Sequence, residues 1–174
     1  MKRKSILIAS VILLMFSTTS ACSKNSDETE HSIKDPVTRA YNSWLKRGKQ
    51  AIPDIEKAAA SDNWRMRSHA MLALGKLGDQ SHVSIALDRL KNDTRIPVRN
   101  SAVIALGNLE SDKAVPVLMP LLDSKSGVSP SLVAEALGKI GDNAAVKPLY
   151  RALYTKNRAL RLKVVEALVS IKDP

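Results

Sequence analysis

The chain has 174 residues, one cysteine (Cys22) and a net charge of +10. This length excludes more than one domain of ordinary size with a short extension, and a lone cysteine excludes an intrachain disulfide framework. The excess of basic residues favours an anionic partner.

Residues 1–21 have the three-part layout of a secretory signal peptide. A basic start is followed by an apolar stretch over residues 6–16 and by small polar residues over 17–21. Since a permanent membrane span needs roughly 20 apolar residues, we expect residues 1–21 to be removed after export.

Cys22 follows this segment directly, and the stretch "TSAC" resembles the lipobox of bacterial lipoproteins, although Thr19 stands where that motif usually has leucine. The resemblance implies that Cys22 is the lipid attachment site; a free reactive thiol is the alternative. Residues 22–35 are polar and predict a flexible, lipid-anchored tether. We expect a protein of the bacterial cell envelope, at the outer membrane facing the periplasm if the organism has one; the alternative is a soluble periplasmic or secreted protein.

Residues 36–174 repeat with a period of 31 or 32 residues, which predicts stacked units of a solenoid. One set of equivalent positions is Leu74, Leu106, Leu137 and Leu168. A second, independent set is Ala51, His82, Ala114 and Ala145.

Each unit predicts two helices, a first helix A with an apolar stripe of helical period and a second helix B. Glycine inside helix A (Gly75, Gly107 and Gly138) predicts a close approach by a neighbouring backbone, since glycine is unfavourable there. Gly-Asp pairs at 78–79 and 141–142 predict the turn into helix B. Because Pro116 and Pro120 lie in one helix B, we expect that helix to be irregular.

The pattern VRxxAxxALGxIGDxxAVxxL resembles the HEAT-like repeat named after phycobilin lyases, and Val98, Arg99 and the stretches 105–107 and 141–144 carry it most closely. The resemblance implies an all-α fold, a right-handed α-solenoid of HEAT-like helix pairs over residues 36–174. It also implies that Arg67, Arg99 and Arg161 pair with loop aspartates, a role that Asp62 and Asp93 are placed to fill.

The resemblance brings three enzyme classes, which the residues disfavour. Metal-dependent hydroxylases of this repeat carry His-Glu pairs that are absent from this sequence. Phycobilin lyases act inside the cell, whereas this chain begins with an export signal, so a lyase-like enzyme is the less favoured alternative. Nucleic-acid repair enzymes fit the charge but not the expected location. We therefore expect no enzyme, no catalytic residues, no cofactor, no metal and no nucleic acid.

What remains is a binding or scaffold module that mediates protein–protein interaction at the envelope; the alternative is a module for an anionic envelope component. In the B helices, Val117 and Leu121 predict an apolar outward spot, and Lys147 with Arg151 a cationic rim. The alternative is that neighbouring repeats cover the two apolar residues. A further surface is expected on the last helix, where part of a face is predicted to lie uncovered and to contact a second copy or a partner; its residues are Leu160, Val164, Leu168 and Val169. The alternative is that the face is small and the solenoid simply stops there.

Overall fold

The computed structural model describes residues 35–123 and 125–171, and over these ranges the chain is helical without any strand. The helices are α3 (Pro36–Arg47), α4 (Ile52–Ala59), α5 (Trp64–Leu77), α6 (Val83–Asn92), α7 (Ile96–Asn108), α8 (Val115–Leu118), α9 (Pro130–Ile140), α10 (Val146–Ala152) and α11 (Arg158–Ile171). Short 3₁₀ turns precede or extend the B helices: Gly48–Ala51, Gln80–His82, Asp112–Ala114, Met119–Leu122 and Asn143–Ala145.

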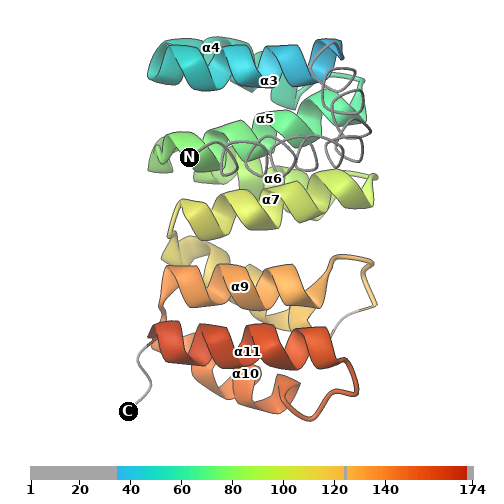
Figure 1. The fold of residues 1–174 in the computed structure, drawn as a ribbon, viewed down its shortest axis with the longest axis vertical. Helices are drawn as coiled ribbons and strands as arrows, with labels where there is room; N and C mark the ends of the chain where they lie inside the picture. Colours follow the sequence, from blue (N-terminus) through green and yellow to red (C-terminus); the bar gives the residue numbers. More distant parts are fainter. Residues whose placement is uncertain (1–34, 124, 172–174) are drawn as a thin grey trace, which may run out of the picture. The chain divides into compact units, whose positions relative to one another are not determined.

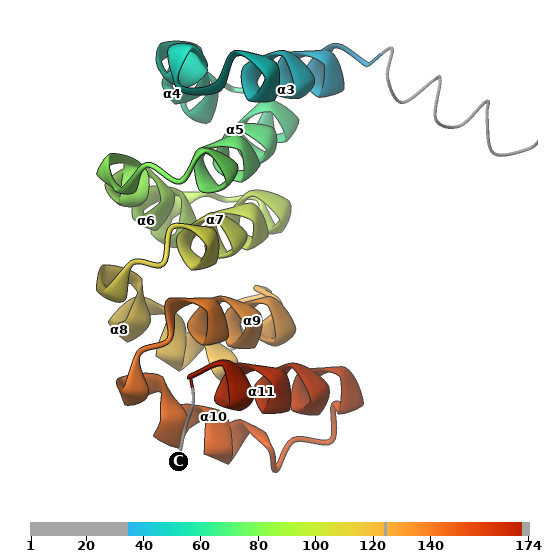
Figure 2. The ribbon, with the colours of Figure 1, turned by 60° about the vertical axis from the view of Figure 1, so that its left-hand side comes forward.

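Residues from Ala40 onward form one compact unit with two layers of helices. Helices α5, α7, α9 and α11 stack in chain order as the A layer, and α4, α6, α8 and α10 form the B layer beside them (Figures 1 and 2). A continuous apolar core runs along the unit, from Trp44 to Ile171. The predicted all-α solenoid is confirmed.

Glycine sets the distance between successive A helices. A Cβ atom built on Gly75 would lie 2.7 Å from the Cα of Ala105, and one built on Gly107 would lie 2.8 Å from the Cα of Ala136. The same contact recurs at Gly138, 2.7 Å from the Cα of Ala167. Side chains have no room at these distances, so the predicted close approach is confirmed at all three glycines.

The turns into the B helices also follow the prediction. Gly78 and Gly141 end α5 and α9 in the left-handed conformation, with φ of 69° and 77°. The carboxylates of Asp79 and Asp142 then accept the backbone N–H of Ser81 and Ala144. These bonds satisfy amides that a helix start otherwise leaves unpaired.

The third B helix is irregular, as its two prolines predict. Helix α8 ends at Leu118 after a single turn, and a 3₁₀ turn, Met119–Leu122, takes its place. Because proline has no backbone N–H, Pro120 cannot donate the next α-helical hydrogen bond.

Arg67 joins two loops, as the family resemblance implied. Its Nε and Nη2 donate to the carboxylate of Asp93 at 2.7 and 3.0 Å, while Nη1 donates to the carbonyls of Ser61 and Asp62 at 2.8 and 3.0 Å. Asp62 therefore accepts from Arg67 through its backbone oxygen, whereas Asp93 accepts through its carboxylate. The Asp93 side chain is 1% exposed, so the pair is shielded from water.

The other two arginines of this column bind loop carbonyls instead of aspartates. Arg99 Nη2 donates to the carbonyl of Ser126 at 2.8 Å, and Arg161 Nη1 donates to the carbonyl of Thr155 at 2.8 Å. Each still fixes a loop to an A helix, because a guanidinium supplies several donors in a rigid plane.

The expectation for the last helix is wrong for most of its residues. Leu160, Val164 and Leu168 are buried, at 4%, 0% and 9% exposed. They pack toward α9 and α10, and only Val169, 73% exposed, lies on the open face.

We expect Gly107→Ala to lower the free energy of unfolding by about 1–3 kcal/mol, because the new methyl group must separate α7 from α9. Intrinsic helix propensity alone predicts the opposite sign. Val169→Ala is the matched control: it lies at the equivalent position of α11, is exposed, and should change the free energy by less than about 0.5 kcal/mol in urea unfolding. Equal stability of Gly107→Ala and wild type would contradict the close-contact account.

We expect Asp93→Ala to lower the free energy of unfolding by about 3–5 kcal/mol, because Arg67 loses its shielded partner. Asp54→Ala removes the exposed Arg47–Asp54 pair and should cost less than about 1 kcal/mol.

The effect of Asp93→Ala should also depend on pH. Burial disfavours the charged carboxylate, but hydrogen bonds from Arg67 and from the Arg95 backbone outweigh it, so the pKa of Asp93 is lowered. Its stabilising contribution is therefore complete above the unfolded-state pKa of about 3.9 and is lost as the pH falls through the lower folded-state value. The difference between wild type and Asp93→Ala should shrink in acid, and a difference that grows below pH 4 would refute this assignment.

Candidate functional site

The four residues predicted to bind a partner lie on the B layer in two different settings. Val117 and Leu121 are half-buried and pack against the core, while Lys147 and Arg151 are exposed on α10. Tyr150, 49% exposed, lies on the same helix between them. The basic rim is thus accessible, and the apolar spot is partly covered, as the alternative interpretation anticipated.

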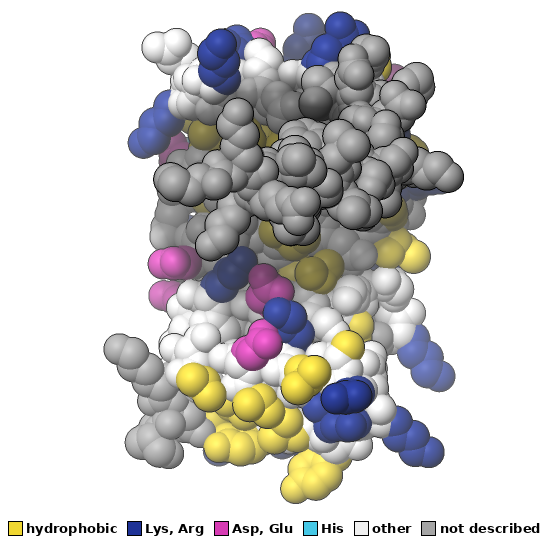
Figure 3. Space-filling model, viewed as in Figure 1, with side chains coloured by type: hydrophobic (Ala, Val, Ile, Leu, Met, Phe, Trp, Pro, Cys, Tyr) yellow, Lys and Arg dark blue, Asp and Glu magenta, His cyan; other side chains and the backbone are white. Residues whose placement is uncertain are grey.

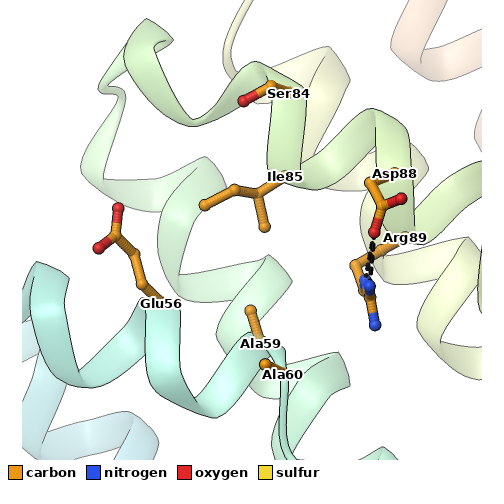
Figure 4. Close-up of a pocket in the computed structure, with 7 residues that line it drawn as sticks. All are labelled: Glu56, Ala59, Ala60, Ser84, Ile85, Asp88 and Arg89. Carbon is orange, nitrogen blue, oxygen red and sulfur yellow. Dashed lines mark hydrogen bonds and ion pairs between the residues drawn. The ribbon is translucent and has the colours of Figure 1, made fainter.

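A groove that sequence analysis did not identify lies between α4 and α6. It has a volume of about 340 Å³ and is lined by Glu56, Ala59, Ala60, Ser84, Ile85, Asp88 and Arg89. Figure 4 shows Ile85 pointing into the space between the two helices, above the methyl groups of Ala59 and Ala60. The middle of the groove is therefore apolar.

Charged groups stand at the two ends of this groove, with Glu56 at one end and the Asp88–Arg89 pair at the other (Figure 4). Asp88 also accepts a hydrogen bond from the side chain of Asn92 at 2.7 Å. Bonds from Arg89 and Asn92 stabilise the carboxylate and lower the pKa of Asp88. Arg89 is thus paired with a carboxylate that favours its charged form, and the Arg89 side chain is 28% exposed beside the groove.

Glu56 is joined to a buried histidine. His82 Nε2 lies 3.2 Å from Glu56 Oε1, and the His82 side chain is 8% exposed. On the other side of the ring, Nδ1 lies 3.1 Å from the hydroxyl of Ser81. Nδ1 also lies 3.3 Å from the backbone carbonyl oxygen of Asp79. Because that oxygen can only accept, Nδ1 donates to it in one protonation state of the ring and accepts from Ser81 in another, while Nε2 donates to Glu56.

A second hollow of about 600 Å³ adjoins the groove and shares Ala60 with it. Its lining includes Trp44 from α3, Lys57 from α4 and Met66 from α5. Trp44 is 5% exposed, so the accessible surface of the two hollows is mainly aliphatic. Their charged lining includes the cations Lys57 and Arg89 and the carboxylates of Asp54, Asp62 and Asp88.

The repeat pattern includes His82 only as one of four equivalent positions, although its residue type marks it as unusual there. The equivalent positions Ala51, Ala114 and Ala145 are all 0% exposed, and His82 is 6% exposed. An ionisable residue in a column of buried alanines needs a polar partner. Glu56 supplies it from the preceding repeat, 26 positions away in sequence, where no short motif could connect the two.

Within the described residues, no group of three or more His, Cys, Asp or Glu side chains is placed to hold a metal ion. In the same ranges, no helix has the length and apolarity needed to cross a membrane. Cys22, the expected lipid attachment site, lies outside the described residues.

Comparison with known proteins places repeats along most of the described chain. Residues 42–107 match the family described as HEAT repeats, and residues 98–124 and 132–155 match PBS lyase HEAT-like repeats. The chain is also 31% identical over 125 residues to the "Bilin biosynthesis protein PecE" of Mastigocladus laminosus. That alignment covers 68% of this chain and 46% of the relative, so the chain spans about half the length of that protein.

These similarities contradict the expectation that the chain is not an enzyme. The relative is a bilin biosynthesis protein and the matched repeats are named after a lyase, so both findings point toward an enzymatic role. The expected export signal, on which that expectation was mainly based, lies outside the described residues. The fold itself agrees with both family matches, since the described residues form an α-solenoid of successive helix pairs, as HEAT repeats do.

Proposed function

We propose that the repeat array binds a bilin, or a related linear tetrapyrrole, in the groove between α4 and α6 and acts on it there. The observation that carries this proposal is the groove itself, an apolar slot with Arg89 at one end and the Glu56–His82 pair at the other. The similarity to a bilin biosynthesis protein supplies the ligand class.

The chemistry of such a ligand matches the two hollows. A linear tetrapyrrole is elongated and mostly apolar and carries two propionate carboxylates. Its rings can lie against Ile85 and Met66, while its carboxylates can pair with Arg89 and Lys57. Charge-assisted hydrogen bonds of this kind are the stronger ones in proteins, so the two cations should fix the orientation of the ligand.

The Glu56–His82 pair gives the groove a group that can exchange protons with a bound ligand. The carboxylate of Glu56 lies 3.2 Å from His82 Nε2 and orients the ring. Glu56 itself lines the groove, and its side chain is 47% exposed. In this proposal Glu56 contacts the ligand and His82 serves as the positioning residue behind it.

We expect the purified chain to bind biliverdin, a linear tetrapyrrole, and to shift its visible absorption. Arg89→Ala with Lys57→Ala should weaken binding by at least about 10-fold, since a lost charge-assisted hydrogen bond costs roughly 1.5–3 kcal/mol. Titration by absorbance, with circular dichroism to verify folding of each variant, measures this.

Lys147→Glu with Arg151→Glu is the control for this titration, because it removes two exposed cations from α10, outside the groove. This control should bind biliverdin like wild type. If it loses binding while Arg89→Ala with Lys57→Ala retains it, the α10 surface is the ligand site and the groove assignment is wrong. Absence of any spectral shift with wild type would reject bilin as the ligand.

A second candidate function concerns a protein partner. Lys147 and Arg151 are exposed one helical turn apart on α10, with Val117 and Leu121 partly exposed on α8 and in the turn that follows it. A cationic rim next to a partly apolar surface suits an acidic protein segment or an anionic envelope component. HEAT-type arrays commonly use extended surfaces of this kind as scaffolds.

We also propose that the protein works at the bacterial envelope, attached through lipid on Cys22. Metabolic labelling with palmitate should mark the wild type and leave Cys22→Ser unlabelled. Ser20→Ala serves as the control, since a small residue is retained there and labelling should persist. Label that remains in Cys22→Ser, or that never appears in wild type, would reject the lipid anchor.

A further inference from the structure

The last A helix exposes a face that is buried in every preceding described repeat. Val165 is 50% exposed, whereas its equivalents Met71, Val103 and Ala134 are each 0% exposed beneath the next A helix. Val169, 73% exposed, stands where Gly75, Gly107 and Gly138 contact the following helix. Leu162, 56% exposed, lies one turn before Val165. We call Leu162, Val165, Val169 and Tyr154 the end face.

Val169 prevents another helix from stacking on α11 as α11 stacks on α9. In the inner repeats even a single Cβ at this column would lie 2.7–2.8 Å from the backbone of the next helix. A whole valine side chain requires a much larger separation. The end face therefore suits a deformable surface, which can accommodate the protruding Val169 side chain. A close-packed helix cannot accommodate it.

The surroundings of the end face are cationic and aromatic. Residues 143–165 contain six basic and no acidic residues. Lys156 is exposed on the turn that carries Tyr154, itself 93% exposed, and Arg158 is exposed at the first position of α11. Figure 3 shows hydrophobic side chains gathered over α11 and the preceding turn, with basic side chains beside them.

One acidic residue, Glu166, lies next to this face and is already paired. Its carboxylate accepts from Lys163 Nζ at 2.9 Å. The same ammonium lies 3.5 Å from Glu135, and the Glu166 bond raises the pKa of Lys163. The acidic side chain is thus balanced locally, and the basic residues on the turn dominate the charge.

We propose that the end face docks on an anionic lipid bilayer. Apolar side chains enter the boundary between headgroups and acyl chains, tyrosine prefers that boundary, and basic residues pair with anionic headgroups. A second copy of the chain would fit the apolar residues but would bring together two strongly basic surfaces. This proposal does not depend on the bilin site, which lies between α4 and α6.

The test places an environment-sensitive fluorophore on Val169→Cys in a Cys22→Ser background, so that no acyl group contributes. Vesicles of phosphatidylcholine with phosphatidylglycerol should raise and blue-shift the fluorescence, and vesicles of phosphatidylcholine alone should not. The same label on Lys113→Cys, an exposed position between α7 and α8, is the matched control and should not respond. Lys156→Glu with Arg158→Glu should lower the affinity for anionic vesicles, measured at position 169, by at least about 10-fold.

Several outcomes would overturn the proposal. Equal responses at positions 113 and 169 would mean that another part of the chain holds the protein at the membrane. A response at 169 that grows with protein concentration without vesicles would assign the face to a second copy. No response at 169 would leave the face to a protein partner. Lys91→Glu with Lys113→Glu, labelled at 169, controls for net charge and should bind vesicles like the parent.

Discussion

The contact between a glycine of one A helix and an alanine of the next determines the geometry of the whole array. A Cβ atom placed on any of these glycines would lie less than 3 Å from the Cα of an alanine in the next A helix; the glycines are Gly75, Gly107 and Gly138. Glycine is unfavourable within a helix by up to about 1 kcal/mol relative to alanine, and tight packing of successive backbones offsets that cost. Because the contact recurs along the stack, one repeated residue choice sets the spacing that positions every B helix.

The fold followed from the sequence because its determinants are local and periodic. The spacing of leucines, the Gly-Asp turns and the pair Pro116–Pro120 act within one repeat, so their structural effects could be predicted. The arginine column was less predictable. Its position was evident, but Arg99 and Arg161 bind carbonyls whose placement depends on loop conformation. The burial of Leu160 and Leu168 was missed because helical arithmetic cannot tell which neighbour covers a given face.

The candidate site could not be predicted in the same way, since its residues come from two repeats and share no motif. Glu56 belongs to α4, and His82 belongs to the turn before α6. Only the replacement of a buried alanine by His82 marked the location in the sequence. The expected basic rim at Lys147 and Arg151 is accessible, because charged residues on a B helix need only avoid the core to be exposed, whereas Val117 and Leu121 partly joined it.

The two layers differ in what they can tolerate. The A layer is constrained at each junction by backbone contact, so most changes there alter the spacing of the stack. The B layer meets fewer such constraints: it accommodates the full helix α6, the single turn of α8 and the proline-containing α10 within the same array. A solenoid of this construction can therefore acquire new ligands through changes of side chains, or of helix length, in the B layer while the A layer preserves the stacking. Related proteins can then differ in chemistry and still share the same architecture.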